Sequence, residues 1–188
     1  NGNPYPAMGL IMYTRSGSSW NNEWATGSTY PQDYSFQLDD NDQPFISNHR
    51  RNSGDIVLES KTSSSNNAWS SSTADNTGSC SGSCAYTDIE IDSNGDPHIA
   101  YYDHATDDLV HAERSGNTWT TTTLRSDGDV GDYPAMILDN NDRPIIAHYD
   151  HTNTNLLLTS YDSDGDSIPD YRDSNNNSQF VIEELYDA

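Results

Sequence analysis

The stretch Ile91-Asp-Ser-Asn-Gly-Asp-Pro-His-Ile-Ala100 decides the fold, because the chain repeats it with small changes. The pattern recurs from Leu38 to Ser47 and from Leu138 to Ala147, and a truncated copy opens the chain as Asn1-Gly-Asn-Pro-Tyr5. The shared prolines stand at positions 4, 44, 97 and 144, and tryptophans at 20, 69 and 119 recur in step with them. Two independent landmarks that repeat together indicate four structural units.

Each unit is predicted to contain four short strands. In the third unit, residues 86–91 alternate between polar and apolar side chains, and an Asn-Gly turn follows them. Further strands are expected at 98–102, 109–113 and 119–124. Four antiparallel strands per repeat are typical of a β-propeller blade. We therefore expect an all-β protein, a β-propeller-like repeat of about four units with four-stranded antiparallel blades and a short calcium-loop tail.

With this motif, the chain resembles the propeller-like repeats of secreted bacterial proteins, which carry Leu-Asp-x-Asn-Gly-x-Pro-His-Ile-x-Tyr-Tyr-Asp followed by a Leu-x-Tyr-Ala segment and a Trp. The resemblance implies a repeat domain over 1–161, followed by an acidic tail over 162–188. Its units are expected at about 1–26, 33–72, 86–124 and 133–161. Because propellers serve unrelated roles, the resemblance implies the fold more than the function.

The repeat domain begins and ends inside a unit rather than at a unit boundary. The first unit is expected to lack its first strand, and the last unit is expected to end after its third strand near Tyr161. In one interpretation, the two ends complete each other in a closed four-bladed ring. In the other, a neighbouring molecule supplies the missing strands and polymers result. Residues 180–185 are expected to form either a strand that completes a blade or a short helix.

The charge of the chain excludes several partners. Thirty acidic and eight basic side chains give a formal net charge of -22. Nucleic acid and anionic membrane surfaces attract clustered Lys and Arg, so neither is an expected partner. No apolar run reaches transmembrane length, and membrane insertion is not expected. The chain starts at Asn1 without a signal peptide, which indicates a processed product or a fragment of an exported protein.

Calcium is the expected cofactor, because Asp side chains alternate along one short C-terminal segment. This segment, residues 162–173, resembles a thrombospondin type 3 repeat and an EF-hand loop. A second loop over 173–184 follows in register, although both loops carry Ser where the EF-hand pattern has Gly. The expected ligands are Asp162, Asp164, Asp166, the Ile168 carbonyl, Asp170, Asp173, Asn175, Asn177 and Glu184.

Two further features indicate an extracellular or cell-surface protein. Cys80 and Cys84 flank a Ser/Gly loop and lack nearby zinc ligands, so a short-range disulfide is expected. Asn176 begins an N-glycosylation acceptor pattern inside the second acidic loop.

Catalysis is not expected, because the candidate groups follow the repeat. The pairs Asp103-His104 and Asp150-His151 occupy equivalent loops, where loop-stabilising hydrogen bonds are the expected role. The turn residues Asp39, Asp92 and Asp139 are expected to bond to the backbone two residues on, rather than to hold cations. No Gly-x-Ser-x-Gly, phosphate-binding or His-Glu-x-x-His motif occurs.

Three functions are compatible with these features. The first is a calcium-stabilised structural or surface protein, with self-association into filaments through unfilled strands. The second is a closed propeller that binds carbohydrate or protein. The third is a glycan-active hydrolase on a propeller scaffold.

Overall fold

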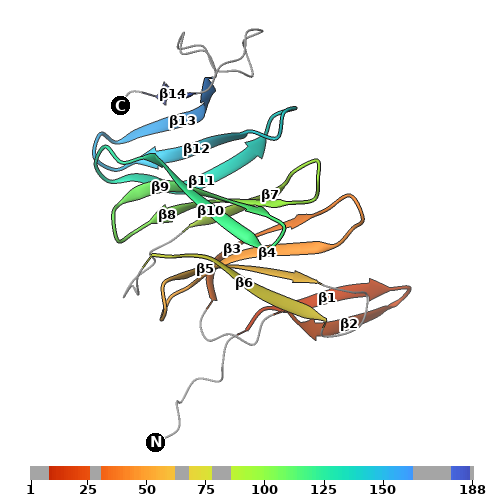
Figure 1. Cartoon of the computed structure of the whole chain (residues 1–188). Coiled ribbons are helices and arrows are strands. Elements are labelled where there is room, and N and C mark those ends of the chain that lie inside the picture. Colours follow the sequence, from red (N-terminus) through yellow and green to blue (C-terminus); the bar gives the residue numbers. More distant parts are fainter. Residues whose placement is uncertain (1–8, 26–30, 62–67, 78–85, 163–178, 187–188) are drawn as a thin grey trace, which may run out of the picture.

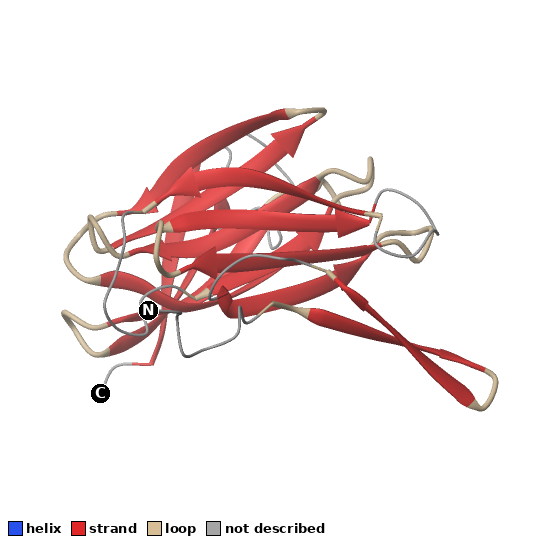
Figure 2. Ribbon diagram, turned by 90° about the horizontal axis from the view of Figure 1, so that it is seen from below, coloured by secondary structure: helices blue, strands red, loops and turns tan. Residues whose placement is uncertain are grey.

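The computed structural model describes residues 9–25, 31–61, 68–77, 86–162 and 179–186. Figure 2 shows strands and loops throughout this part of the chain. The strands are β1 (Ile11–Ser16), β2 (Ser19–Trp24), β3 (Pro31–Leu38), β4 (Pro44–Arg50), β5 (Asp55–Lys61), β6 (Trp69–Asn76), β7 (Thr87–Ile91), β8 (Pro97–Asp103), β9 (Asp108–Ser115), β10 (Thr118–Arg125), β11 (Val130–Leu138), β12 (Pro144–Asp150), β13 (Asn155–Asp162) and β14 (Gln179–Tyr186). The described residues include no helix that could span a membrane.

These strands form four antiparallel sheets in chain order. The first sheet is the hairpin β1–β2, and the second, third and fourth sheets contain β3–β6, β7–β10 and β11–β14. Each four-stranded sheet is a simple meander, in which every strand pairs with its neighbour in the sequence. The chain is therefore an all-β, propeller-like repeat of four-stranded blades that follows a two-stranded half blade.

The sheets stack in an open row. Figure 1 shows the first sheet at one end of the described stack and the fourth sheet at the other, with the second and third between them. The described residues therefore do not form the closed four-bladed ring, which was one of the two interpretations of the sequence. Among the described residues, the first unit contributes two strands rather than a four-stranded blade.

The fourth sheet is complete within the chain, contrary to the expectation that its unit ends after three strands. β14 pairs with β13 along its length, from Asp162 opposite Gln179 to Leu156 opposite Tyr186. Of the two forms considered for residues 180–185, the structure has the strand that completes a blade. β14 removes the free edge that β13 would otherwise present, and a free edge favours association with other chains.

The third sheet is buried on both faces. Ile99 and Tyr101 pack with Ile56 and Leu58 of the second sheet. The intervening Ala100 faces the other way and packs with Met136 of the fourth sheet. This alternation is the two-residue period of a strand, and it explains why all but the last residue of β8 is buried. Full burial of one such aliphatic side chain stabilises the fold by about 1.5–3 kcal/mol.

The repeated acidic turns have the role that the sequence predicts. Asp92 Oδ1 accepts hydrogen bonds from the backbone N–H groups of Asn94 and Asp96, at 2.9 and 2.7 Å. Asp39 and Asp139 make the equivalent bonds in their own turns. Burial alone raises the pKa of Asp92, but the N–H donors of Asp96 and Asn94 outweigh burial and hold that pKa below its ordinary value. These residues are confirmed as hairpin-turn residues.

Candidate functional site

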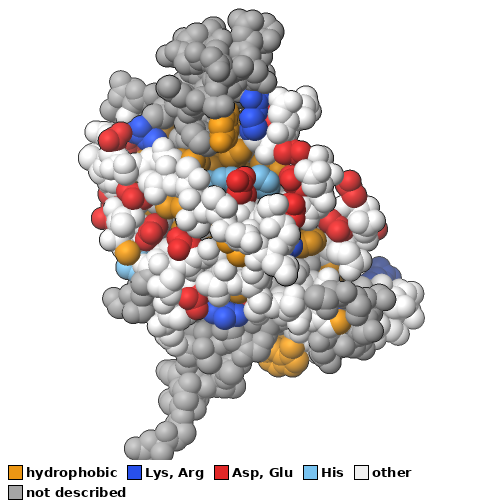
Figure 3. Space-filling model, viewed as in Figure 1, with side chains coloured by type: hydrophobic (Ala, Val, Ile, Leu, Met, Phe, Trp, Pro, Cys, Tyr) orange, Lys and Arg blue, Asp and Glu red, His pale blue; other side chains and the backbone are white. Residues whose placement is uncertain are grey.

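A polar cavity of about 90 Å³ lies between the third and fourth sheets. The third sheet contributes His111 and Glu113 from β9 and Thr122 from β10; the fourth contributes Asp142, Arg143, Pro144 and Tyr161. The cavity thus combines carboxylates, a guanidinium group, an imidazole and an aromatic ring. Figure 3 shows His side chains reaching the surface on this face of the molecule, beside acidic and basic side chains.

Strand register places the groups of the third sheet on one face. His111 and Glu113 are two residues apart on β9, so their side chains point to the same side of the sheet. His98 on β8 stands directly opposite Glu113, and Thr122 on β10 stands opposite His111. Three neighbouring strands therefore bring these side chains together without any irregular backbone.

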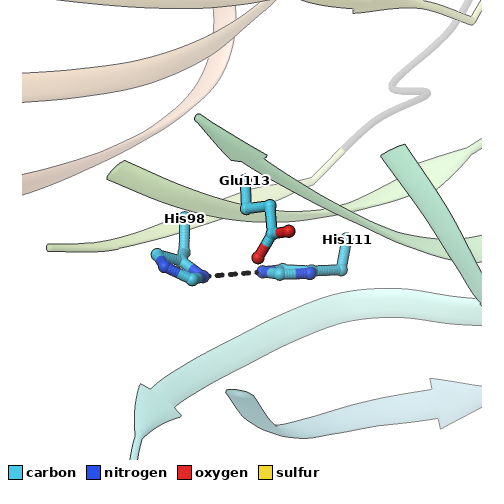
Figure 4. Close-up of side chains that lie close together, drawn as sticks. All are labelled: His98, His111 and Glu113. Atoms are coloured by element: carbon cyan, nitrogen blue, oxygen red, sulfur yellow. Dashed lines mark hydrogen bonds between the residues drawn. The ribbon is translucent and has the colours of Figure 1, made fainter. Parts of the chain in front are cut away.

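The two histidines are in direct contact. His98 Nδ1 lies 3.0 Å from His111 Nε2, and the rings stack with their centroids 5.1 Å apart. Both side chains are buried, whereas Glu113 is exposed. Figure 4 shows the Glu113 carboxylate directed toward the pair. Burial, helped by the charge of His98, lowers the pKa of His111 to about 3, so His111 is neutral at physiological pH.

The wall from the fourth sheet is held rigidly by its own hairpin turn. Arg143 donates from Nε and Nη2 to Asp139 Oδ2, at 2.9 and 2.7 Å. Asp142 accepts from the backbone N and from Oγ of Ser93, at 3.0 and 2.5 Å. The second contact joins the turn of the fourth sheet to the turn of the third. A preformed wall of this kind binds a ligand with little loss of conformational entropy.

The predicted calcium ligands lie almost wholly outside the described residues. Asp162 is the last residue of β13, opposite Gln179, and Glu184 lies in β14 opposite Leu157. The other seven fall within 163–178, as does Asn176. Cys80 and Cys84 also lie outside the described residues. The calcium loops, the disulfide and the glycosylation site therefore stay predictions.

The Asp-His pairs have the loop-stabilising contacts that were expected. Asp103 accepts a hydrogen bond from the backbone N of Ala105, and Asp150 accepts one from the backbone N of Asn153, both at 2.9 Å. His151 contacts Asp132 at 2.5 Å, and this pair links the loop after β12 to β11.

Sequence reasoning missed the cluster of His98, His111 and Glu113. The repeat pattern places His98 in the Pro-His-Ile strand motif and does not distinguish the His-x-Glu pair of β9 from other strand residues. One signal is available, since pairing the expected strands at 98–102 and 109–113 outward from the loop between them brings His98 opposite Glu113. The stacking of the rings depends on packing, which the sequence pattern does not show.

Comparisons with known proteins give two likenesses of fold. No family model and no curated protein matches the chain. A fucose lectin from Kordia zhangzhouensis, solved with methyl-fucoside, is 18% identical with a TM-score of 0.49, over 82% of this chain and 99% of the lectin chain. A bifunctional GH43-CE protein of Bacteroides eggerthii is 10% identical with a TM-score of 0.46, over 93% of this chain and 24% of that one. At these values neither likeness indicates what this chain binds.

Proposed function

We propose that the chain is a propeller-like module that binds carbohydrate, with the cavity between the third and fourth sheets as its binding site. The observation that carries this proposal is the combination of groups in that cavity. Glu113 offers an acceptor and the hydroxyl of Thr122 offers a donor at the wall, and the ring of Tyr161 offers an apolar face. A sugar presents neighbouring hydroxyl groups at its rim and C–H groups on its faces, so it needs both kinds of contact.

The size of the cavity favours a small ligand. A volume of about 90 Å³ suits the partial insertion of one sugar unit rather than the burial of a long chain. Because Glu113 is exposed, the site is accessible from solvent without movement of the sheets. A terminal sugar of a glycan is therefore the proposed ligand, and an extracellular or surface location is proposed with it.

A glycan array probed with the labelled whole chain, followed by calorimetric titration of the best glycan, tests this function. The variants Glu113→Gln and Tyr161→Ala are expected to weaken binding at least tenfold, a change of about 1.4 kcal/mol. Asp127→Asn is the matched control, because its carboxylate is 80% exposed and lies outside the cavity. Circular dichroism confirms that each variant is folded. Absence of any bound glycan, or equal affinity in all variants, contradicts the proposal.

A second candidate is self-association through the first sheet, which a specific observation favours. This two-stranded sheet exposes large aromatic side chains: Tyr13 is 62%, Trp20 is 64% and Trp24 is 50% exposed. Aromatic side chains exposed together on one hairpin are typical of interaction surfaces. In this proposal, calcium in the loops at 162–184 stabilises the far end of the stack. Negative-stain microscopy with calcium and after chelation tests it: fibres that dissolve on chelation support assembly, and discrete particles under both conditions contradict it.

A further inference from the structure

The cluster of His98, His111 and Glu113 has the composition of a transition-metal site. Its potential ligand atoms all lie within 4.8 Å of one another. Two imidazole nitrogens and one carboxylate oxygen are a ligand set that zinc and its neighbours in the periodic table accept. Calcium and magnesium prefer oxygen ligands, so this cluster does not suit the cation expected for the acidic tail.

The spacing of the nitrogens supports the same conclusion. His98 Nδ1 and His111 Nε2 are 3.0 Å apart. Two nitrogens that each lie 2.0–2.1 Å from a tetrahedral zinc ion are separated by roughly 3.3 Å. A shift of a few tenths of an ångström therefore converts the observed contact into a coordinating pair. Figure 4 shows that the Glu113 carboxylate approaches from the side on which the two nitrogens meet.

A carboxylate also lies near the second ring nitrogen of His98, on the side away from His111. Asp92 Oδ2 lies 3.9 Å from Nε2 of His98, the nitrogen that does not face His111. Metal-bound histidines usually direct their second nitrogen toward a carboxylate, a carbonyl or a water, which sets the tautomer and the ring orientation. Asp92 is itself fixed by its turn, so it is positioned to serve in this role.

Comparison of the repeats shows that the fold does not require these three residues. The positions of His98, Glu113 and His111 are filled in the second sheet by Phe45, Ser60 and Leu58, and in the fourth by Ile145, Ser160 and Leu158. Both other sheets thus use two apolar side chains and a serine where the third has two imidazoles and a carboxylate. Burial of two histidines at positions that are apolar in the other sheets costs desolvation free energy. Metal binding would compensate for that cost and so explain why histidines occupy these positions.

We propose that His98, His111 and Glu113 bind a transition-metal ion of the Zn²⁺ class. Because His111 and Glu113 also line the cavity, the ion lies at the cavity wall, where water or a ligand oxygen completes its coordination. The site does not depend on the proposed carbohydrate binding, since metal affinity is measured without any sugar.

The test is calorimetric titration of the chelator-treated whole chain with ZnCl2, in the presence of excess CaCl2 to occupy carboxylate sites. The main variant combines His98→Phe, His111→Leu and Glu113→Ser, the residues that the second sheet uses. Loss of an outer-shell partner costs roughly 10–100-fold in metal affinity, so loss of the ligands themselves is expected to cost at least that. His151→Asn is the control, because it removes another His that contacts a carboxylate. It is expected to bind Zn²⁺ as the unchanged chain does.

Equal Zn²⁺ affinity in the triple variant, or no binding by the unchanged chain, overturns the proposal. Glu113→Gln gives a second test that does not depend on repacking, because Glu113 is exposed. Its Zn²⁺ affinity is expected to fall at least tenfold, and the visible absorption bands of bound Co²⁺ are expected to change. An unchanged affinity together with an unchanged Co²⁺ spectrum removes Glu113 from the site and contradicts the proposed ligand set.

Discussion

The Asp88 carboxylate accepts a hydrogen bond from the backbone N–H of Met136 at 2.6 Å, across the boundary between the third and fourth sheets. Its other oxygen accepts a bond from Ser35 Oγ of the second sheet at 2.5 Å. One side chain on β7 therefore joins three consecutive sheets. The stack is held by directed polar contacts at this point as well as by its apolar layers.

Removal of this carboxylate is expected to destabilise the whole stack. A hydrogen bond to a charged group contributes about 1.5–3 kcal/mol, and Asp88→Ala also leaves the Met136 N–H without its acceptor. Denaturant unfolding should show a loss of at least about 2 kcal/mol in the free energy of unfolding. Asp88→Asn keeps one acceptor and should lose less. Stability within about 0.5 kcal/mol of the unchanged chain for Asp88→Ala would mean that the sheets are held by apolar contacts alone.

Two buried histidines make stability depend on pH. Burial and the nearby charge of His104 lower the pKa of His49 to about 4, against an opposing effect of Asp55. Burial and the nearby charge of Arg125 lower the pKa of His148 to about 4 as well, against an opposing effect of Asp150. Both values lie below the unfolded value of about 6.5.

Between these pH values the unfolded chain binds protons that the folded chain does not, so stability falls as the pH falls from 6.5 to 4. Denaturant unfolding at several pH values in this window measures the slope. His148→Asn, which introduces the residue found at the same register position in β4, is expected to reduce the slope. An identical slope in the variant would show that His148 is protonated equally in both states.

Gly131 marks a close approach of two sheets. Its φ angle is +113°, and a Cβ atom there would lie 2.7 Å from the Cα of Leu109. Gly131→Ala is expected to cost at least about 2 kcal/mol, from steric overlap and backbone strain together. Gly116→Ala is the matched control, since Gly116 also has a positive φ but open space around it, and strain alone costs about 1 kcal/mol. Similar losses of thermal stability in the two variants would contradict the close approach.

β14 is expected to protect the end of the stack. A chain that ends at Asp162 lacks this strand and presents β13 as an unpaired edge. We expect a lower melting temperature and concentration-dependent association, measured by calorimetry and sedimentation velocity. The full chain in chelator is the control, because it keeps the strand in the absence of divalent cations. A truncated chain that is monomeric and equally stable would show that β14 contributes little.

The sheets could be predicted from the sequence because their landmarks are local. The Asp-x-Asn-x-x-Pro turn sets the register of each first hairpin, as the bonds of Asp39, Asp92 and Asp139 show. The tryptophans likewise mark the last strand of a unit: Trp69 and Trp119 stand opposite Lys61 and Arg114 in equivalent registers.

The stacking of the sheets and the candidate site could not be predicted in the same way. A long acidic segment whose composition favours loops separates β13 from β14. The sequence of residues 180–185 is therefore compatible with either a strand or a helix. The cavity depends on which face of the third sheet meets the fourth, and hydrophobic alternation does not decide this where both faces are buried. The His98–His111 contact depends on that packing.

The location of a bound sugar tests the central claim most directly. Amide chemical shifts of the ¹⁵N-labelled whole chain should be recorded during titration with the glycan selected on the array. We predict that the largest changes occur at His111, Glu113, Thr122 and Arg143 around the cavity. Changes confined to Tyr13, Trp20 and Trp24 of the first sheet would contradict the account, and they would assign binding to the aromatic hairpin instead.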